Sequence, residues 1–270
     1  MQEDIEKMSA REMIEYTTKG VRNAKVTVGI VQNGQMSFNV YGENSEKLLN
    51  KEYIYEIASI TKVFTGQLFA KAINENKADL NDSISLFLNL PAKNYYPTIK
   101  RLLTHTSGYK NEYYEHYVSS NNFINGGNIL NGITEEMVIN RIGTINLENR
   151  NYPYDYSNFG VAVAGLVLTK IYDEEITSLF NNYLKNDLGL HNTKVSDGSG
   201  DLSHYCIYNK ANPRIAAGAL VSTVTDMMQY AQMQIDETLP YLGYSHSVWA
   251  QFNTPIYNYL EYNIKGTSKN

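Results

Sequence analysis

The sequence has little that would build covalent or metal-stabilised structure. A single cysteine among 270 residues, Cys206, excludes an intrachain disulfide and a zinc site made of several cysteines. With only 6 prolines and 18 glycines, collagen-like and low-complexity chains are excluded as well. The 5 histidines are scattered without metal-ligand spacing, and no HExxH, Walker-type, GxSxG or GxGxxG pattern occurs. We therefore expect no metal site and no cofactor.

Long apolar runs and clusters of positive charge are also missing. The longest uncharged apolar run, residues 159–168, is about half as long as a membrane span requires. The charged N-terminus has no apolar signal-peptide segment. The formal net charge is −5, without a Lys/Arg cluster, which argues against nucleic-acid binding. We expect no membrane span, no nucleic-acid partner and a cytoplasmic location, or an extracytoplasmic one if a leader has been removed.

The pattern that is present begins with a helix and a hairpin. An amphipathic helix is expected over residues 3–19, with an apolar stripe of Ile5, Met8, Met13 and Ile14. Two segments of alternating apolar residues follow, and Asn33-Gly34 separates them. Asn-Gly suits a type I′ turn, which needs positive φ at both central residues, so an antiparallel hairpin is predicted.

The middle of the chain has helical periodicity instead. Helices are expected over residues 58–74, 99–103, 134–143, 159–173 and 223–235, and a long loop over 110–132. Thr134 is a candidate N-cap, and Thr223 with Asp226 suggests a capping box. The run after Phe159 is apolar all round, which indicates a buried helix. We interpret the chain as one α+β domain, residues 1–270, with a large helical middle.

Ser59-Ile60-Thr61-Lys62 is the first candidate for chemistry. A serine in the first turn of a helix with a lysine three residues later places both side chains on one face. The helix N-terminus favours a developing alkoxide, and a partly desolvated lysine can act as its base. Ser-x-x-Lys is a weak pattern alone, and without further context an ordinary N-cap serine is the favoured interpretation of Ser59. The pattern recurs at Ser107–Lys110, where no apolar helix follows.

Tyr156-Ser157-Asn158 is the second candidate, placed just before the buried helix. A tyrosine hydroxyl near a lysine can shuttle a proton, and an asparagine amide can bind a substrate carbonyl. The alternative is a structural turn with a packed tyrosine. Tyr109-Lys110-Asn111 matches the same short pattern, so neither match is specific by itself.

These pieces become specific through their combination and order. The chain resembles the serine β-lactamase-related family, which includes class C β-lactamases, penicillin-binding proteins, D-amino-acid-specific peptidases and related esterases. The resemblance covers about residues 20–235. It rests on the early strand pair, Glu56–Gly66, Leu102–Gly108, Tyr156-Ser157-Asn158, Leu188–Thr193 and Gly218–Met227.

The resemblance implies both a fold and a set of roles. The fold would be an antiparallel sheet flanked by helices, with sheet parts over residues 20–58 and about 205–270 and a helical lobe over about 59–204. Ser59 would be the acylated nucleophile, Lys62 a base or relay, Tyr156 the acid–base partner and Asn158 a substrate-amide ligand. The substrate would be a small molecule or peptide with an amide, ester or β-lactam carbonyl.

His105 and Cys206 are of residue types that often catalyse, but both are expected to be structural. In the family resembled, the segment that carries His105 is a turn below the site, so His105 is not expected to catalyse. Cys206 has no neighbour in sequence that would lower its pKa, so we interpret it as a packed thiol.

One family motif is missing from this sequence. Lys-Thr-Gly or His-x-Gly is expected on a late strand facing Ser59, together with one oxyanion donor, and neither tripeptide occurs. Residues 258–265 are a candidate for the first late strand, so the late sheet is expected to be incomplete. Three alternatives could explain the missing motif. The gene could be truncated, a partner chain or self-association could complete the sheet at an open edge, or the chain could be a reduced family member that no longer catalyses. The chain is therefore expected to be an active serine hydrolase or, failing that, a binding or scaffold module.

Overall fold

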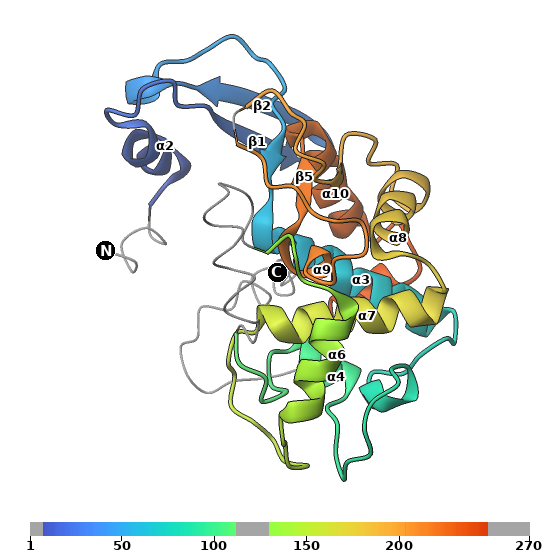
Figure 1. Cartoon of the computed structure of the whole chain (residues 1–270). Coiled ribbons are helices and arrows are strands. Elements are labelled where there is room, and N and C mark those ends of the chain that lie inside the picture. Colours follow the sequence, from blue (N-terminus) through green and yellow to red (C-terminus); the bar gives the residue numbers. More distant parts are fainter. Residues whose placement is uncertain (1–7, 112–129, 203, 248–270) are drawn as a thin grey trace.

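A computed structural model describes residues 8–111, 130–202 and 204–247 (Figure 1). The N-terminal helix and hairpin lie at one end of the molecule, and the helices α4 (Ile99–Leu103) and α6 (Glu135–Thr144) at the other. The helices α3 (Thr61–Asn74), α7 (Asn158–Tyr172) and α9 (Ile215–Gly218) pack together between them. No helix within the described ranges is long and apolar enough to cross a membrane.

The predicted hairpin is confirmed. Strands β1 (Val26–Gln32) and β2 (Gln35–Tyr41) pair antiparallel, with Gln32 opposite Gln35. Asn33 and Gly34 have φ of 51° and 75°, as a type I′ turn requires. Helix α10 (Val224–Asp236) packs against β1. A Cβ on Gly29 would lie 2.7 Å from the Val224 side chain, so this contact requires a glycine.

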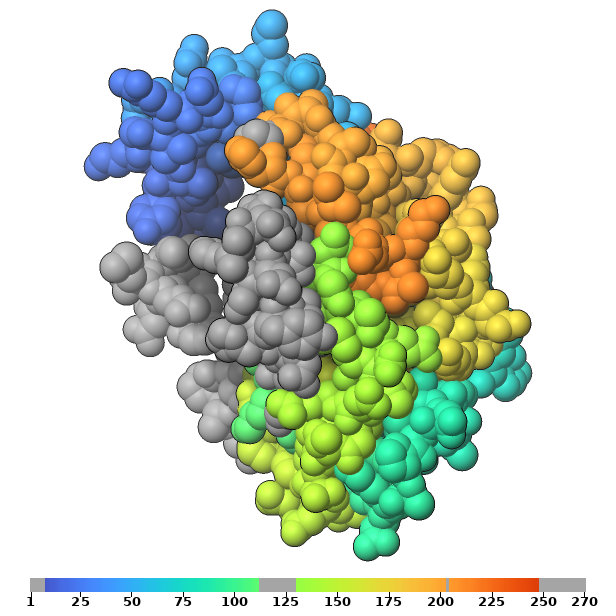
Figure 2. All heavy atoms as spheres, viewed as in Figure 1, coloured from blue at the N-terminus to red at the C-terminus, as the bar shows by residue number. Residues whose placement is uncertain are grey.

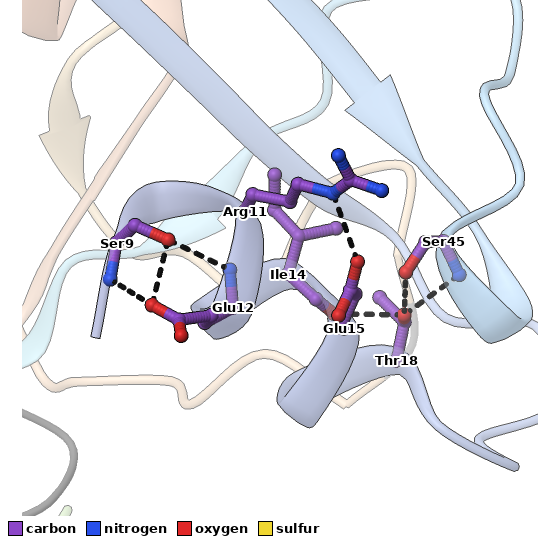
Figure 3. Close-up of polar contacts among 7 residues, drawn as sticks. All are labelled: Ser9, Arg11, Glu12, Ile14, Glu15, Thr18 and Ser45. Carbon is purple, nitrogen blue, oxygen red and sulfur yellow. Dashed lines mark hydrogen bonds and ion pairs between the residues drawn. The ribbon is translucent and has the colours of Figure 1, made fainter.

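Helix α2 (Ala10–Thr18) is shorter than expected. Ser9 caps it with a capping box, in which its hydroxyl accepts from Glu12 N–H and the Glu12 carboxylate accepts from Ser9 N–H (Figure 3). The cap fixes the start at Ala10, so Met8 lies outside the helix, and residues 3–7 lie outside the described ranges. Ile14 is buried, but Met13 is exposed, contrary to the predicted stripe.

A second antiparallel sheet lies beside the start of α3. Its strand order is β3 (Tyr55–Glu56), β5 (Leu220–Ser222), β4 (Lys194–Val195). The N–H of Ile57 also donates to the carbonyl of Leu220 at 3.0 Å. The sheet therefore joins the segment before Ser59 to the last third of the chain. The late strand expected over residues 258–265 lies outside the described residues.

The loop after β4 meets the segment before β3. Figure 2 shows an orange part of the chain against the blue N-terminal part. The N–H of Ile54 donates to Asp201 Oδ1 at 3.0 Å, and the Tyr205 hydroxyl donates to the Ile54 carbonyl at 2.7 Å. These bonds hold the segment that leads into the turn carrying Ser59.

The helical middle follows the predicted pattern. Every residue of α7 from Phe159 to Leu168 is buried, as the all-apolar run predicts. A Cβ on Gly165 would lie 2.6 Å from Ala216 Cβ, so α7 and α9 touch through small residues. Around them lie α8 (Ile176–Asn182), η4 (Tyr183–Asp187), α11 (Leu242–Ser245) and, farther out, η3 (Ile84–Leu86), whereas η1 (Glu43–Ser45) packs against α2.

Helix α10 begins where expected, but its first turn is not a capping box. The Thr223 hydroxyl accepts from Asp226 N–H at 3.4 Å. The Asp226 carboxylate, instead of returning to Thr223, accepts from Asn192 N–H at 2.8 Å and from the Thr193 hydroxyl at 2.7 Å. The prediction of a reciprocal bond is therefore wrong, because the buried Asp226 carboxylate accepts hydrogen bonds from a segment 34 residues away.

Candidate active site

Ser59 lies in a tight turn in front of the helix. A 3₁₀ turn, η2 (Ala58–Ile60), precedes α3, so Ser59 is one step earlier than the predicted first α-helical turn. Ala58 has φ of 44°, a left-handed conformation that a residue with a Cβ adopts only under constraint. The Ser59 side chain is exposed. The turn therefore presents the hydroxyl to solvent on a backbone that its surroundings hold in place.

Lys62 lies one turn farther along and reaches back to Ser59. Its ammonium donates to Ser59 Oγ at 3.0 Å and to the carbonyl of Ala217 at 2.5 Å, although the residue is only 4% exposed. The second bond aims the ammonium, because it ties the side chain to α9. The predicted geometry of serine and lysine on one face is confirmed.

Tyr156 completes a three-membered cluster. Its hydroxyl lies 2.7 Å from Ser59 Oγ, and Lys62 Nζ lies 4.9 Å from the centre of its ring. Ser59 Oγ is thus within hydrogen-bond distance of two groups that can exchange a proton with it. The cluster joins residues separated by 97 positions in the sequence.

Asn158 lies on the same turn but bonds elsewhere. It is the first residue of α7, and both its backbone N–H and its side-chain Nδ2 donate to Asn111 Oδ1, at 3.2 and 2.9 Å. A backbone N–H cannot exchange roles, so it fixes Asn111 Oδ1 as the acceptor and the amide nitrogen of Asn158 as the facing atom. No hydrogen bond joins Asn158 to Ser59 or Lys62 in the described part of the chain.

Two threonines of α3 tie the turn that carries Ser59 to α9 and β5. The Thr65 hydroxyl donates to the carbonyl of Ala216 at 2.6 Å, and the Thr61 hydroxyl accepts from the N–H of Leu220 at 3.2 Å. Both residues are buried. Sequence reasoning missed these contacts, because nothing in the local pattern shows which carbonyl a buried threonine will meet.

A second segment, residues 105–111, supports the Tyr156 turn; we call it the bracket. The Ser157 hydroxyl donates to the Lys110 carbonyl at 2.7 Å while it caps α7 by accepting from Gly160 N–H at 2.8 Å. The N–H of Phe159 donates to the Asn111 carbonyl at 2.9 Å. The bracket therefore holds both the turn and the start of the buried helix.

The bracket also explains the repeated sequence patterns. Ser107 is buried and its hydroxyl accepts from Tyr109 N–H at 3.2 Å, while the Lys110 ammonium pairs with Asp155 at 2.7 Å. Ser107 and Lys110 thus engage groups other than each other, unlike Ser59 and Lys62. The role of Asn111 was missed, although the Ser-Gly-x-x-Asn composition indicates a turn.

The surroundings of Cys206 do not favour a reactive thiol. Burial first, and then the neighbouring Glu56, raise the pKa of the Cys206 thiol above its usual value, which disfavours the thiolate. Over the described ranges, no group of three or more His, Cys, Asp and Glu residues is placed to hold a metal ion.

The chain is similar to known proteins over most of its length. The Beta-lactamase family model matches residues 11–252. Protein flp of Staphylococcus aureus (strain MRSA252) is 27% identical over 187 residues, which are 66% of this chain and 36% of that protein. A beta-lactamase of Providencia stuartii is 24% identical over 225 residues, 78% of this chain and 55% of that protein. The chain thus spans about a third to a half of the length of these relatives.

Solved structures share the fold. The octameric penicillin-binding protein homologue from Pyrococcus abyssi matches with a TM-score of 0.66 and 20% identity, over 87% of this chain and 58% of its own. A beta-lactamase/D-alanine carboxypeptidase from Yersinia pestis, complexed with citrate, matches with a TM-score of 0.61 and 19% identity, over 85% and 67%. Since the family model covers most of the sequence and these structures share its β-lactamase/transpeptidase-like fold, the chain belongs to the serine β-lactamase-related family.

Proposed function

We propose that this protein is a serine hydrolase that forms an acyl-enzyme on Ser59. The observation that carries the proposal is the position of Ser59 Oγ, 2.7 Å from the Tyr156 hydroxyl and 3.0 Å from Lys62 Nζ. A serine is a weak nucleophile unless a neighbouring group removes its proton as it attacks. Membership of the family supports hydrolysis of amides or β-lactams in general terms.

The chemistry follows from the three side chains. The Ser59 proton passes to the Tyr156 phenolate, with Lys62 as the ammonium, or to Lys62 as the neutral amine, as Oγ attacks the substrate carbonyl, and the same proton then goes to the departing nitrogen or oxygen. The bond from the carbonyl carbon to that atom breaks and leaves the acyl group on Ser59. Water next gives up a proton to the same pair and attacks the ester, which releases the acid and restores Ser59. The charge on Lys62 stabilises negative charge on either neighbouring oxygen.

The proposed substrate is a small molecule or peptide with a D-peptide, β-lactam or ester carbonyl. Solved relatives of the same fold are described as a D-alanine carboxypeptidase and as a D-stereospecific amidohydrolase from Streptomyces sp.. Asn158 is proposed to bind the substrate amide through its side chain. We propose no cofactor, because acyl transfer to serine needs none.

A second candidate function rests on the missing motif. This sequence has neither Lys-Thr-Gly nor His-x-Gly, so no segment of it is identified with the strand that, by the resemblance, would supply the second oxyanion donor. Loss of one such donor typically costs about 10²–10³ in kcat. The alternative is therefore a ligand-binding or scaffold module with an impaired site, to which a partner chain or a second copy adds a strand at an open sheet edge.

Intact-mass spectrometry separates the two candidates. The wild-type protein is incubated with a fluorophosphonate or a penicillin, next to Ser59→Ala and to Ser85→Ala, an exposed serine in η3. A hydrolase gains the mass of one adduct, Ser85→Ala gains the same, and Ser59→Ala gains none. Folded wild-type protein that stays unmodified, yet is thermally stabilised by the penicillin, supports the binding module and refutes the hydrolase.

A further inference from the structure

The imidazole of His105 lies directly beneath the Tyr156 turn. Its ring centroid is 4.6 Å from that of Tyr156, with the two planes tilted by 36°. Its Nδ1 accepts the backbone N–H of Ser157 at 3.1 Å, and its own carbonyl accepts the N–H of Asp155 at 2.9 Å. His105 therefore contacts the residues on both sides of Tyr156 and the Tyr156 ring itself.

The hydrogen bond from Ser157 decides the form of the imidazole. A backbone N–H only donates, so Nδ1 must be unprotonated, and the neutral ring carries its proton on Nε2. Nε2 is buried and has no hydrogen-bond partner in the described part of the chain. Since an unpartnered buried N–H is costly, the ring is held here by the Nδ1 bond and by its packing.

The surroundings keep this imidazole uncharged. The ring faces Lys62 of α3 and Asp155 of its own neighbouring turn, and it packs edge-on against Tyr154 as well as on Tyr156. Burial first, and then the Lys62 cation, lower the pKa of His105 to about 3, while Asp155 acts in the opposite direction. A charged His105 would set a second cation beside Lys62 and lose the Ser157 bond.

The backbone of His105 belongs to the same arrangement. Helix α4 ends at Leu103, and His105 follows with φ of 56°, a left-handed conformation in which Asn, Asp and His are several-fold enriched. Asn76 has the same conformation, φ of 56°, two residues after the end of α3, and it is exposed and away from the cluster. The chain therefore contains a matched control for the backbone alone.

We propose that His105 is a positioning residue, which holds the Tyr156 hydroxyl on Ser59 Oγ through the ring contact and the anchored Ser157 backbone. The inference rests on the proposed role of Ser59 as the nucleophile. His105 touches neither Ser59 nor a reacting atom. Its effect reaches the reaction only through the place of Tyr156.

Three variants of His105 separate its two contacts. His105→Asn keeps an acceptor and suits the left-handed backbone, His105→Phe keeps a ring without an acceptor, and His105→Ala removes both. With a fluorophosphonate, the maximal labelling rate of Ser59 should fall about 3-fold in His105→Asn, about 10-fold in His105→Phe and about 30-fold or more in His105→Ala. These falls are expected because a general base changes a rate by roughly 10²–10⁴-fold, and much of that effect depends on how the base is positioned. The half-saturating concentration should change little.

Asn76→Ala is the control, and thermal melting confirms that each variant is folded. Asn76→Ala should lower the melting temperature without changing the labelling rate. A folded His105→Ala that labels within 2-fold of wild type overturns the proposal, and so does a rate that falls equally in Asn76→Ala.

A second readout is independent of activity. Fluorine NMR of protein containing 3-fluorotyrosine, with Tyr156 assigned from Tyr156→Phe, reports on its hydroxyl. Ser59→Ala should shift this resonance in the wild-type background and leave it unmoved with His105→Ala, because Tyr156 no longer meets Ser59. Equal shifts in both backgrounds refute the positioning role. Wild-type protein that shows the coupling but is never acylated refutes the proposed hydrolase alone.

Discussion

The two halves of the candidate site are built in different ways. Ser59 and Lys62 are three residues apart, and the 3₁₀ turn η2 followed by the first turn of α3 brings them together. Tyr156 comes from another helix start, and the bracket of residues 105–111 holds it in place. The first half follows from local spacing, whereas the second depends on contacts between segments that are distant in sequence. Chemistry encoded locally is visible in the sequence, and its orientation by remote segments is not.

The largest expected effect tests the local half. Lys62→Ala should reduce the acylation rate of Ser59 about 10³–10⁴-fold, since it removes a proton-transfer group and a neighbouring charge. Quenched-time mass spectrometry of the fluorophosphonate adduct measures the rate. Lys71→Ala, on the same helix but paired with Asp187, is the control and should label normally. Normal labelling of Lys62→Ala would show that Tyr156 activates Ser59 alone.

Removal of the remote hydroxyl is expected to have a smaller effect. Tyr156→Phe keeps the ring that packs on His105 and deletes only the group 2.7 Å from Ser59 Oγ. The acylation rate should fall about 10²-fold, with the melting temperature unchanged. Tyr154→Phe on the same turn is the matched control. If both phenylalanine variants label alike, the second half of the site does no chemistry.

The buried carboxylate of Asp226 tests long-range support. Asp226→Asn keeps the shape but weakens the charged acceptor of the bonds from Asn192 and Thr193. Urea unfolding should show a loss of about 2–3 kcal/mol, because hydrogen bonds to a charged group contribute about 1.5–3 kcal/mol each. Asp236→Asn, in the last turn of the same helix, serves as the control. An unchanged midpoint would show that this tie contributes little.

The histidine below Tyr156 makes stability depend on pH. The pKa of His105 is lowered to about 3 in the folded protein, so the unfolded chain, with a pKa near 6.5, binds this proton more readily. The stability that the folded protein gains from keeping His105 neutral is complete above about pH 6.5 and is lost progressively as the pH falls toward 3. Between pH 7 and pH 5 the free energy of unfolding should fall by about 2 kcal/mol because of this residue. Urea midpoints should show a shallower loss in His105→Asn than in wild type.

The smallest expected effect belongs to a purely local device far from the site. Ser9→Ala removes the capping box of α2 and should cost about 1 kcal/mol in the free energy of unfolding. The labelling rate of Ser59 should stay as in wild type. A reduced rate would show that the N-terminal helix is coupled to the site, against the separation of local and remote contributions.

Elements that depend on neighbouring residues were predictable. Asn33-Gly34 identified the hairpin, and the uninterrupted apolar run after Phe159 identified α7. The start of α2 was misplaced because apolar periodicity outweighed the Ser9 cap. At Thr223 the local pattern failed because a remote segment competes for Asp226. Short strands such as β3 and β5 carry almost no pattern of their own, since partners supply their hydrogen bonds.

The candidate site was predictable to a similar extent. Spacing suggested Ser59 with Lys62, and only the order of several motifs singled out Tyr156 and Asn158. The bracket was overlooked because Lys110 and Asn111 act through their backbone carbonyls and one amide oxygen, which any residue sequence could in part provide. The roles of these residues in catalysis stay predictions until the variants are measured.

The bond between Lys62 and the Ala217 carbonyl has a consequence for synthesis. It spans 155 residues, and the pairing of β3 with β5 spans a similar stretch. Loops of that length close slowly, and a chain on the ribosome folds as its segments emerge. Ser59 is therefore made early, but Lys62 is aimed only after residue 217 has left the exit tunnel. A nascent chain should be unreactive toward acylating agents until the segment around Ala217 has packed against α3.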